Sequence, residues 1–248
     1  MNPYNTRTGA QAQSSIGPAV RASHAFNVHV RQMAELEQVW QRLVLHLLRS
    51  EGLRAPWALG VTSAIRGEGK STNALGVALS LAQETGDKVL VVEADFSHPT
   101  MTEDFQIVRQ PCLADYLSNA ATLEAAIART TTPNLCVLPA WSVSLAQTGA
   151  SPAAFSAALR HLLPDLMTQL RDKFRYILVD MAGLLEDVNT SEMARHMDGI
   201  LLVVRAGVTP MEKITNAAQL LDPHMVKGVI HVGPDSAMPR WLKGLVAE

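Results

Sequence analysis

The stretch Thr-Ser-Ala-Ile-Arg-Gly-Glu-Gly-Lys-Ser-Thr at residues 62–72 decides the fold of this chain. A short apolar run precedes it at 57–61, and an apolar helical pattern follows it at 73–83. A glycine-rich turn between a strand and a helix is the context that a phosphate-binding loop requires. The N–H groups of such a turn form a concave anion site, and the helix N-terminus adds partial positive charge.

The loop therefore predicts a nucleotide site. Lys70 would reach the terminal phosphates, and the Ser71 hydroxyl would bind Mg²⁺. The pattern G-x-x-x-x-G-K-[ST] has Ala64 at its first position here, so the match is imperfect. A glycine-rich turn without a nucleotide is the alternative, and the acidic strand ends described below argue against it. The candidate nucleotide-binding residues are Arg66, Gly67, Glu68, Gly69, Lys70, Ser71 and Thr72.

Further apolar runs predict the rest of the sheet. They lie at 88–92, 135–138, 176–179, 200–204 and 228–232. Because these strands are apolar throughout and alternate with helical segments, we expect an α/β fold with a mostly parallel sheet and helices on both faces. The fold class predicted is a P-loop NTPase of the partition-ATPase-like type.

The segments between the strands predict helices. Residues 112–130 are expected to form short helices, and residues 151–172 one longer helix that Pro164 should break or kink. Thr209-Pro210-Met211-Glu212 is typical of a capping box with proline at the first helical position.

Two of the strands end in acidic residues. Asp95 closely follows the 88–92 run, and Asp180 directly follows the 176–179 run in the usual form of a Walker B strand. Open α/β sheets bind ligands at the carboxyl ends of their strands. Since Mg²⁺ commonly takes only one or two carboxylates besides water and phosphate oxygens, Ser71, Asp95 and Asp180 are the predicted metal ligands. No Asn-Lys-x-Asp guanine-reading motif is present, which favours ATP over GTP.

The N-terminal part divides into two segments. Residues 1–28 are polar with little periodicity, and we expect a flexible tail. Residues 29–52 carry an apolar stripe and predict an amphipathic helix, which would dock on its own domain or contact a subunit or partner. Residues 55–248 are expected to form the ATPase domain. The stripe consists of Met33, Leu36, Trp40, Leu43 and Leu47.

Composition excludes several functional classes. The formal net charge is −2 and the 21 basic residues form no cluster, so no nucleic acid partner is expected. The two cysteines lack metal-site spacing and fit a cytosolic chain. No apolar run approaches the ~20 residues of a membrane-spanning helix. We therefore expect a cytoplasmic protein, and any membrane association must come through a partner or a surface helix.

Several segments together resemble a known family. They are residues 62–72, 91–99, 113–117, 133–139 and 198–209. They are similar to the bacterial tyrosine kinases and their cytoplasmic ATPase relatives in capsule and exopolysaccharide synthesis. The resemblance implies an ATP·Mg²⁺ domain that works with a membrane polysaccharide chain-length regulator or co-polymerase, and it leaves a homo-oligomer open. It also implies that Lys70 contacts phosphate, with Glu93 and Asp95 as the other candidate catalytic residues.

The chain departs from the family pattern near the acids. Glu93 stands where the family has its first aspartate, a candidate base or water-orienting group. The extra methylene displaces the carboxylate by on the order of 1 Å, and such a misplacement can cost ~10²-fold in rate. Ser97 and His98 replace an arginine pair, and Met181-Ala182-Gly183 replaces Thr-Pro-Pro.

Two further departures concern signalling and assembly. The family's C-terminal tyrosine cluster is missing, and the tyrosines are Tyr4, Tyr116 and Tyr176. The helix at 29–52 lacks the Glu-x-x-Arg-x-x-Arg oligomer motif. The alternatives are a Par- or Min-type partition ATPase, against which Ile65 counts because that class has a signature lysine there, and a catalytically degenerate nucleotide-binding adaptor.

Overall fold

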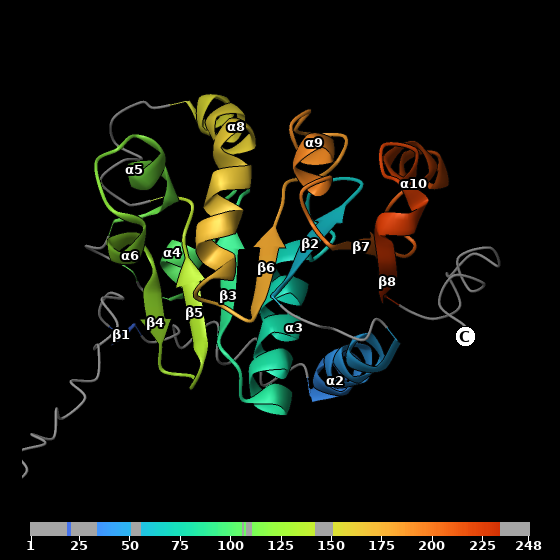
Figure 1. Cartoon of the computed structure of the whole chain (residues 1–248). Coiled ribbons are helices and arrows are strands. Elements are labelled where there is room, and N and C mark those ends of the chain that lie inside the picture. The colour runs from blue at the N-terminus through green and yellow to red at the C-terminus, as the bar shows by residue number, and fades with distance from the viewer. Residues whose placement is uncertain are drawn as a thin grey trace, which may run out of the picture.

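The computed structural model describes residues 19–20, 34–50, 56–105, 107, 111–141 and 151–233. Within them the strands form one eight-stranded sheet with the order β1-β4-β5-β3-β6-β2-β7-β8 (Figure 1). The strands are β1 (Ala19–Val20), β2 (Trp57–Ser63), β3 (Val89–Glu93), β4 (Ala128–Thr130), β5 (Leu135–Leu138), β6 (Tyr176–Asp180), β7 (Gly199–Arg205) and β8 (Val226–Val232). The helices are α2 (Ala34–Ser50), α3 (Lys70–Thr85), α4 (Met101–Asp104), α5 (Leu113–Leu117), α6 (Leu123–Ala126), α8 (Pro152–Arg171), α9 (Thr190–Ala194), α10 (Met211–Ala218) and the 3₁₀ turn η1 (Pro223–Met225).

The sheet is mostly parallel, as predicted. β5, β3, β6, β2, β7 and β8 pair in parallel along their shared edges. Every residue of β3 and β6 is buried, and β2 is buried from its second residue onward. A sheet covered on both faces needs such continuous apolar strands, which explains why the predicted runs match the observed strands closely.

Two large apolar clusters cover the two faces of the sheet. One joins the sheet to α5, α6, α8, α9 and α10. The other joins it to α2, α3 and α4. Figure 1 shows this arrangement, with α8 and α9 on one side of the strands and α2 and α3 on the other.

The edge of the sheet differs from the prediction for residues 112–130. The short helices α5 and α6 are present, but Ala128–Thr130 forms strand β4, antiparallel to β5. A tight connection makes this possible, because Asn134 adopts a left-handed conformation (φ 64°) and the Thr130 hydroxyl donates to the carbonyl of Leu135. Inside the segment predicted as a tail, Ala19–Val20 pairs with β4. The rest of residues 1–28 and residues 234–248 lie outside the described residues, so the domain limits stay predictions.

Two helix predictions need correction. Pro164 was predicted to break or kink the helix, and α8 continues through it without a break. Pro164 lies on the exposed side of the helix, so the hydrogen bond that proline removes falls on the solvated side. Leu163 and Leu166 are buried, and their packing stabilises the helix on both sides of the proline. The capping box at 209–212 is absent. The N-cap of α10 is Pro210, and the Thr209 hydroxyl donates to Glu68 instead.

The N-terminal helix packs on its own domain through α3. Trp40, Val44 and Leu47 are at most 1% exposed and belong to the cluster that contains α3. The Trp40 ring lies directly over Gly76 of α3. A Cβ atom at Gly76 would lie 2.3 Å from Cδ2 and Cε2 of this ring, so only glycine permits such a close approach.

We expect Gly76→Ala to lower the free energy of unfolding by about 1–3 kcal/mol, since it overpacks the contact between α2 and α3. Without the clash, an alanine inside a helix would stabilise by up to about 1 kcal/mol. Urea unfolding measures the change. The double variant Trp40→Ala with Gly76→Ala is the control, because removing the ring removes the clash. A Gly76→Ala protein as stable as wild type would contradict this packing.

Candidate functional site

The phosphate loop connects β2 to α3 through two glycines in the left-handed conformation. Gly67 has φ 82° and Gly69 has φ 94°, values that side-chain-bearing residues rarely adopt. Gly69 is the N-cap of α3, and its carbonyl accepts the backbone N–H of Asn73. Helix α3 therefore begins at Lys70, three residues before the predicted start, and its first N–H groups belong to the loop.

Glu68 braces the loop from within. It is 1% exposed, and its Oε2 accepts the backbone N–H of Ile65 at 2.8 Å. Its Oε1 accepts the backbone N–H of Arg205 at 3.1 Å and the hydroxyl of Thr209 at 2.5 Å. Glu68 was predicted as a nucleotide-binding residue, but its side chain ties the loop to the end of β7 and leaves phosphate contacts to the backbone.

Lys70 and Asp95 meet at the carboxyl edge of the sheet. Both side chains are 6% exposed, and the Lys70 Nζ lies 3.9 Å from Oδ2 of Asp95. The other oxygen of Asp95, Oδ1, accepts the backbone N–H groups of Ser97 and His98 at 3.2 and 3.1 Å. Asp95 is thus held by its own loop with one oxygen directed toward the lysine.

Asp180 is a buried carboxylate with no hydrogen-bond partner of normal geometry on either oxygen, although the Ser71 hydroxyl lies close enough to lower its pKa. It ends β6 between β3 and β2, paired in register with Glu93 on one side and Val61 on the other. Burial raises the pKa of Asp180 to about 7, while the nearby Ser71 hydroxyl and Lys70 ammonium oppose the shift. An unpartnered buried carboxylate is costly unless a cation compensates it, so the residues present fit a metal ion.

The donor set suits Mg²⁺ in particular. The described residues contain no group of three or more histidines, cysteines and acids that could hold a metal by themselves. Mg²⁺ does not need one, because it is usually bound by one or two carboxylates plus water and phosphate oxygens. Ser71, Asp95 and Asp180 would supply the protein ligands.

Glu93 is fully engaged by backbone donors. Its Oε1 accepts the N–H groups of Thr100 and Met101 at 2.6 and 2.9 Å, and its Oε2 accepts the N–H of Ala140 at 2.9 Å. Burial raises the pKa of Glu93 to about 7, and these three hydrogen bonds oppose that shift. The catalytic role of Glu93 stays a prediction. The geometry favours a positioning role. Glu93 lies at the start of the segment that carries Asp95, binds the end of that segment at Thr100 and Met101, and also binds Ala140 just after β5.

The loop after Asp180 also packs on the phosphate loop. The N–H of Leu184 donates to Ser63, and the N–H of Leu185 donates to the carbonyl of Ala64. The Thr62 hydroxyl donates to the carbonyl of Ala182. The two loops that would contact the nucleotide and its metal therefore form one connected backbone network.

The predicted residues largely converge. Lys70, Asp95 and Asp180 meet at one edge, Ser71 adjoins them, and Arg66 and Gly67 form the exposed tip of the loop. Sequence reasoning missed Asn73, Arg205 and Thr209, whose side chains or backbone hold the loop in place. The one available signal for Asn73 was a polar residue inside an otherwise apolar helical pattern.

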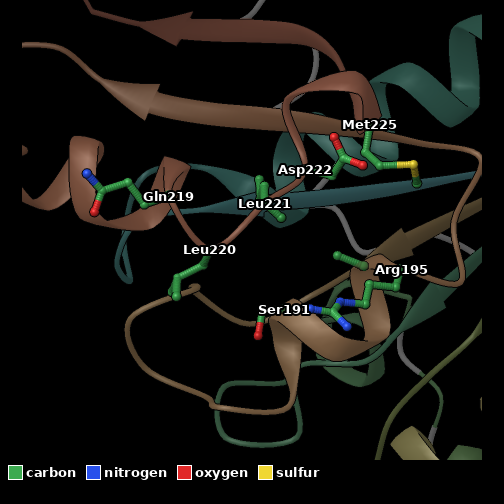
Figure 2. A pocket seen from close by; sticks show the side chains of 8 residues that line it. Ser191, Arg195, Gln219, Leu220, Leu221, Asp222 and Met225 are labelled. Atoms are coloured by element: carbon green, nitrogen blue, oxygen red, sulfur yellow. The ribbon is translucent and has the colours of Figure 1, made fainter.

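A separate pocket of about 400 Å³ lies between α9 and the connection from α10 to β8 (Figure 2). Ser191 of α9 and Arg195, which directly follows α9, approach it from one side, and residues 219–222 and Met225 approach it from the other. None of the predicted nucleotide-site residues lines it. It is therefore not part of the site described above.

Comparison with known proteins identifies the family. A family model described as an AAA domain matches residues 61–223, more than half of the chain. The tyrosine-protein kinase CpsD of Streptococcus agalactiae is 31% identical over 166 residues, which cover 66% of this chain and 68% of CpsD. The chain belongs to the bacterial tyrosine kinase family of P-loop ATPases. The resemblance inferred from the motifs is thereby confirmed.

Other relatives extend the comparison. The succinoglycan biosynthesis transport protein ExoP of Rhizobium meliloti is 31% identical over 152 residues, which cover 61% of this chain and 19% of ExoP. The kinase domain of the Escherichia coli tyrosine kinase Etk superposes with a TM-score of 0.65 at 23% identity, covering 76% of this chain and 71% of that domain. The cell division ATPase MinD of Pyrococcus furiosus superposes with a TM-score of 0.60 at 22% identity, covering 77% of this chain and 78% of the MinD chain. The predicted fold class is confirmed.

Glu93→Asp separates a catalytic from a positioning role. The shorter side chain cannot reach all three backbone donors, so we expect the free energy of unfolding to fall by about 1–3 kcal/mol without a gain in ATP turnover. The control is Glu84→Asp, the same change at an exposed position of α3, which should shift stability by no more than about 0.5 kcal/mol. A Glu93→Asp protein with unchanged stability and faster turnover would instead establish Glu93 as catalytic.

Proposed function

We propose that this protein binds ATP with Mg²⁺ and regulates the polymerisation or export of a capsular or exopolysaccharide, together with a membrane chain-length regulator or co-polymerase. The observation that carries the nucleotide part is Asp180, a buried carboxylate that accepts no backbone hydrogen bond and lies beside Ser71, Lys70 and the phosphate loop. Membership of the tyrosine kinase family and the similarity to ExoP support the polysaccharide part.

Each group of residues has a defined task in this proposal. The N–H groups of residues 67–72 would bind phosphate oxygens, and Lys70 would neutralise the terminal phosphates. Mg²⁺, when bound, would neutralise charge on the phosphate oxygens. Ser71, Asp95 and Asp180 would hold it, and Glu93 would keep the segment that carries Asp95 in place.

The membrane partner and the location are part of the proposal. None of the described helices combines the length and the apolar character needed to cross a bilayer. A peripheral position at the inner membrane through a partner fits both that finding and the biosynthesis transport role in the name of ExoP.

A second candidate is an adaptor that binds the nucleotide but turns it over slowly. The engaged carboxylate of Glu93 favours it, because a group that accepts three backbone N–H bonds is poorly available to orient water or accept a proton. The two candidates share nucleotide binding and differ in turnover. Measuring ATP hydrolysis with and without the partner's cytoplasmic segment distinguishes them.

Calorimetry with ADP and Mg²⁺ tests the nucleotide site. We expect Lys70→Ala to weaken binding at least about tenfold, because a charge-assisted contact to phosphate is lost. We expect Asp180→Asn to reduce the gain in affinity that Mg²⁺ provides. Lys88→Ala is the matched control, since Lys88 is exposed and precedes β3 at the opposite edge of the sheet. Equal affinities in wild type and Lys70→Ala, or no binding in either, would refute the proposed site.

We also expect no stoichiometric tyrosine phosphorylation of this chain. Tyr176 is 4% exposed at the start of β6, and the hydroxyl of Tyr116 accepts a hydrogen bond from Gln169 of α8. A hydroxyl that cannot enter the site cannot accept a phosphoryl group. Mass spectrometry after incubation with ATP, Mg²⁺ and the partner measures this. Stoichiometric phosphotyrosine at any of the three tyrosines would show that kinase activity is retained.

A further inference from the structure

The N-terminal helix reaches the phosphate loop through two consecutive hydrogen bonds, the first buried and the second partly buried. The Nε1–H of Trp40 on α2 donates to Oδ1 of Asn73 on α3 at 2.8 Å. The Nδ2 of Asn73 donates to the carbonyl oxygen of Gly69 in the loop at 2.9 Å. Trp40 is 1% exposed and Asn73 is 2% exposed, so water competes little for the bond between them.

The Gly69 carbonyl is the point at which the loop becomes a helix. It accepts both the backbone N–H and the side-chain amide of Asn73. In a planar trans peptide unit, the C=O and the N–H point in opposite directions. The Gly69 carbonyl points into α3, so the N–H of Lys70 in the same peptide unit points out of the helix. That N–H is one of the unpaired donors at the start of α3, which would face a phosphate. The side chain of Asn73 therefore adds a second restraint, beside its backbone N–H, on the direction of a group that would contact the nucleotide.

Trp40 determines which way the Asn73 amide points. An indole N–H can only donate, so it must face the amide oxygen, and the NH₂ group is then directed at Gly69. The indole itself has little freedom, because its ring packs face-on against Gly76. The position of α2 thus affects the loop, because the Trp40 indole and the Asn73 amide can form these two hydrogen bonds in only one orientation.

We propose that Trp40 and Asn73 are positioning residues of the nucleotide site, and that the docked helix α2 sets the geometry of the phosphate loop through them. The inference rests on the proposed function for its ligand, an ADP or ATP phosphate chain. Neither residue touches the nucleotide. Their effect is to preorganise the peptide between Gly69 and Lys70 before the ligand arrives, which saves the cost of ordering it on binding.

The test is the affinity for a fluorescent ADP analogue with Mg²⁺. Trp40→Phe keeps a ring over Gly76 but loses the donor, and Asn73→Leu keeps approximately the side-chain shape but loses both hydrogen bonds. We expect each to raise Kd by about 2- to 10-fold, the worth of one net hydrogen bond. The matched control is Val44→Ala, a buried truncation on the same face of α2 that leaves the hydrogen bonds in place and should change Kd by less than about 1.5-fold.

A double variant shows whether the two residues act as one unit. Trp40 acts only through Asn73, so Trp40→Phe should have no further effect on Kd in the Asn73→Leu background. If the changes in Kd of the two single variants instead multiplied in the double variant, the proposal would be overturned. So would an unchanged Kd in both single variants, or an equal rise in Val44→Ala.

Hydrogen exchange of the nucleotide-free protein separates this inference from the proposed function. Trp40→Phe should speed exchange of the Asn73 backbone amide, whose N–H donates to the Gly69 carbonyl, relative to the amides of β6, while Val44→Ala should not. If wild type does not bind ADP, the proposed function fails, and the exchange result still decides the link between α2 and the loop. Unchanged exchange of the Asn73 backbone amide in Trp40→Phe would overturn the link even if ADP binds.

Discussion

The parallel pairing of β6 with β3 on one side and β2 on the other is the constraint on which the rest of the site depends. It sets Asp180 in register with Glu93 and with Val61, and it places the loop after β2 beside both acidic strand ends. Lys70 and Asp95, 25 residues apart in the chain, meet for this reason. The continuous burial of these strands makes the register costly to change, because both faces of each strand are covered.

That same burial makes the charged forms of two carboxyl groups costly, and the surroundings of the two groups differ. Glu93 and Asp180 lie opposite each other, and burial raises the pKa of both carboxyl groups to about 7. The three backbone donors to Glu93 make it part of the scaffold. Asp180 has no such donors, which is why we propose it as a metal ligand. Two carboxylates at equivalent strand ends thus serve different purposes because their neighbours differ.

The phosphate loop is held by groups that do not face the ligand. Glu68 connects it to the end of β7, and Asn73 connects it to α2 through Trp40. These contacts keep two left-handed glycines in place in a segment that would otherwise lose much conformational entropy on binding. Preorganisation of this kind explains why residues without a phosphate contact belong to the functional unit.

The sequence by itself determined the fold class and most of the strands, and it singled out residues that the structure brings together at one edge of the sheet. Short continuous apolar runs that end in turn residues or acids are typical of buried strands. The strands β2, β3, β5 and β6 and the loop at 62–72 could therefore be predicted from neighbouring residues in the sequence. Only the tertiary structure decided the inward direction of Glu68, the backbone contacts of Glu93, the strand β4, the unbroken α8 and the link from Trp40 to Asn73. Each of these depends on which distant segment lies alongside. Hydrogen bonds such as that between Thr209 and Glu68 join residues 141 positions apart, and no local pattern in the chain encodes such a pairing.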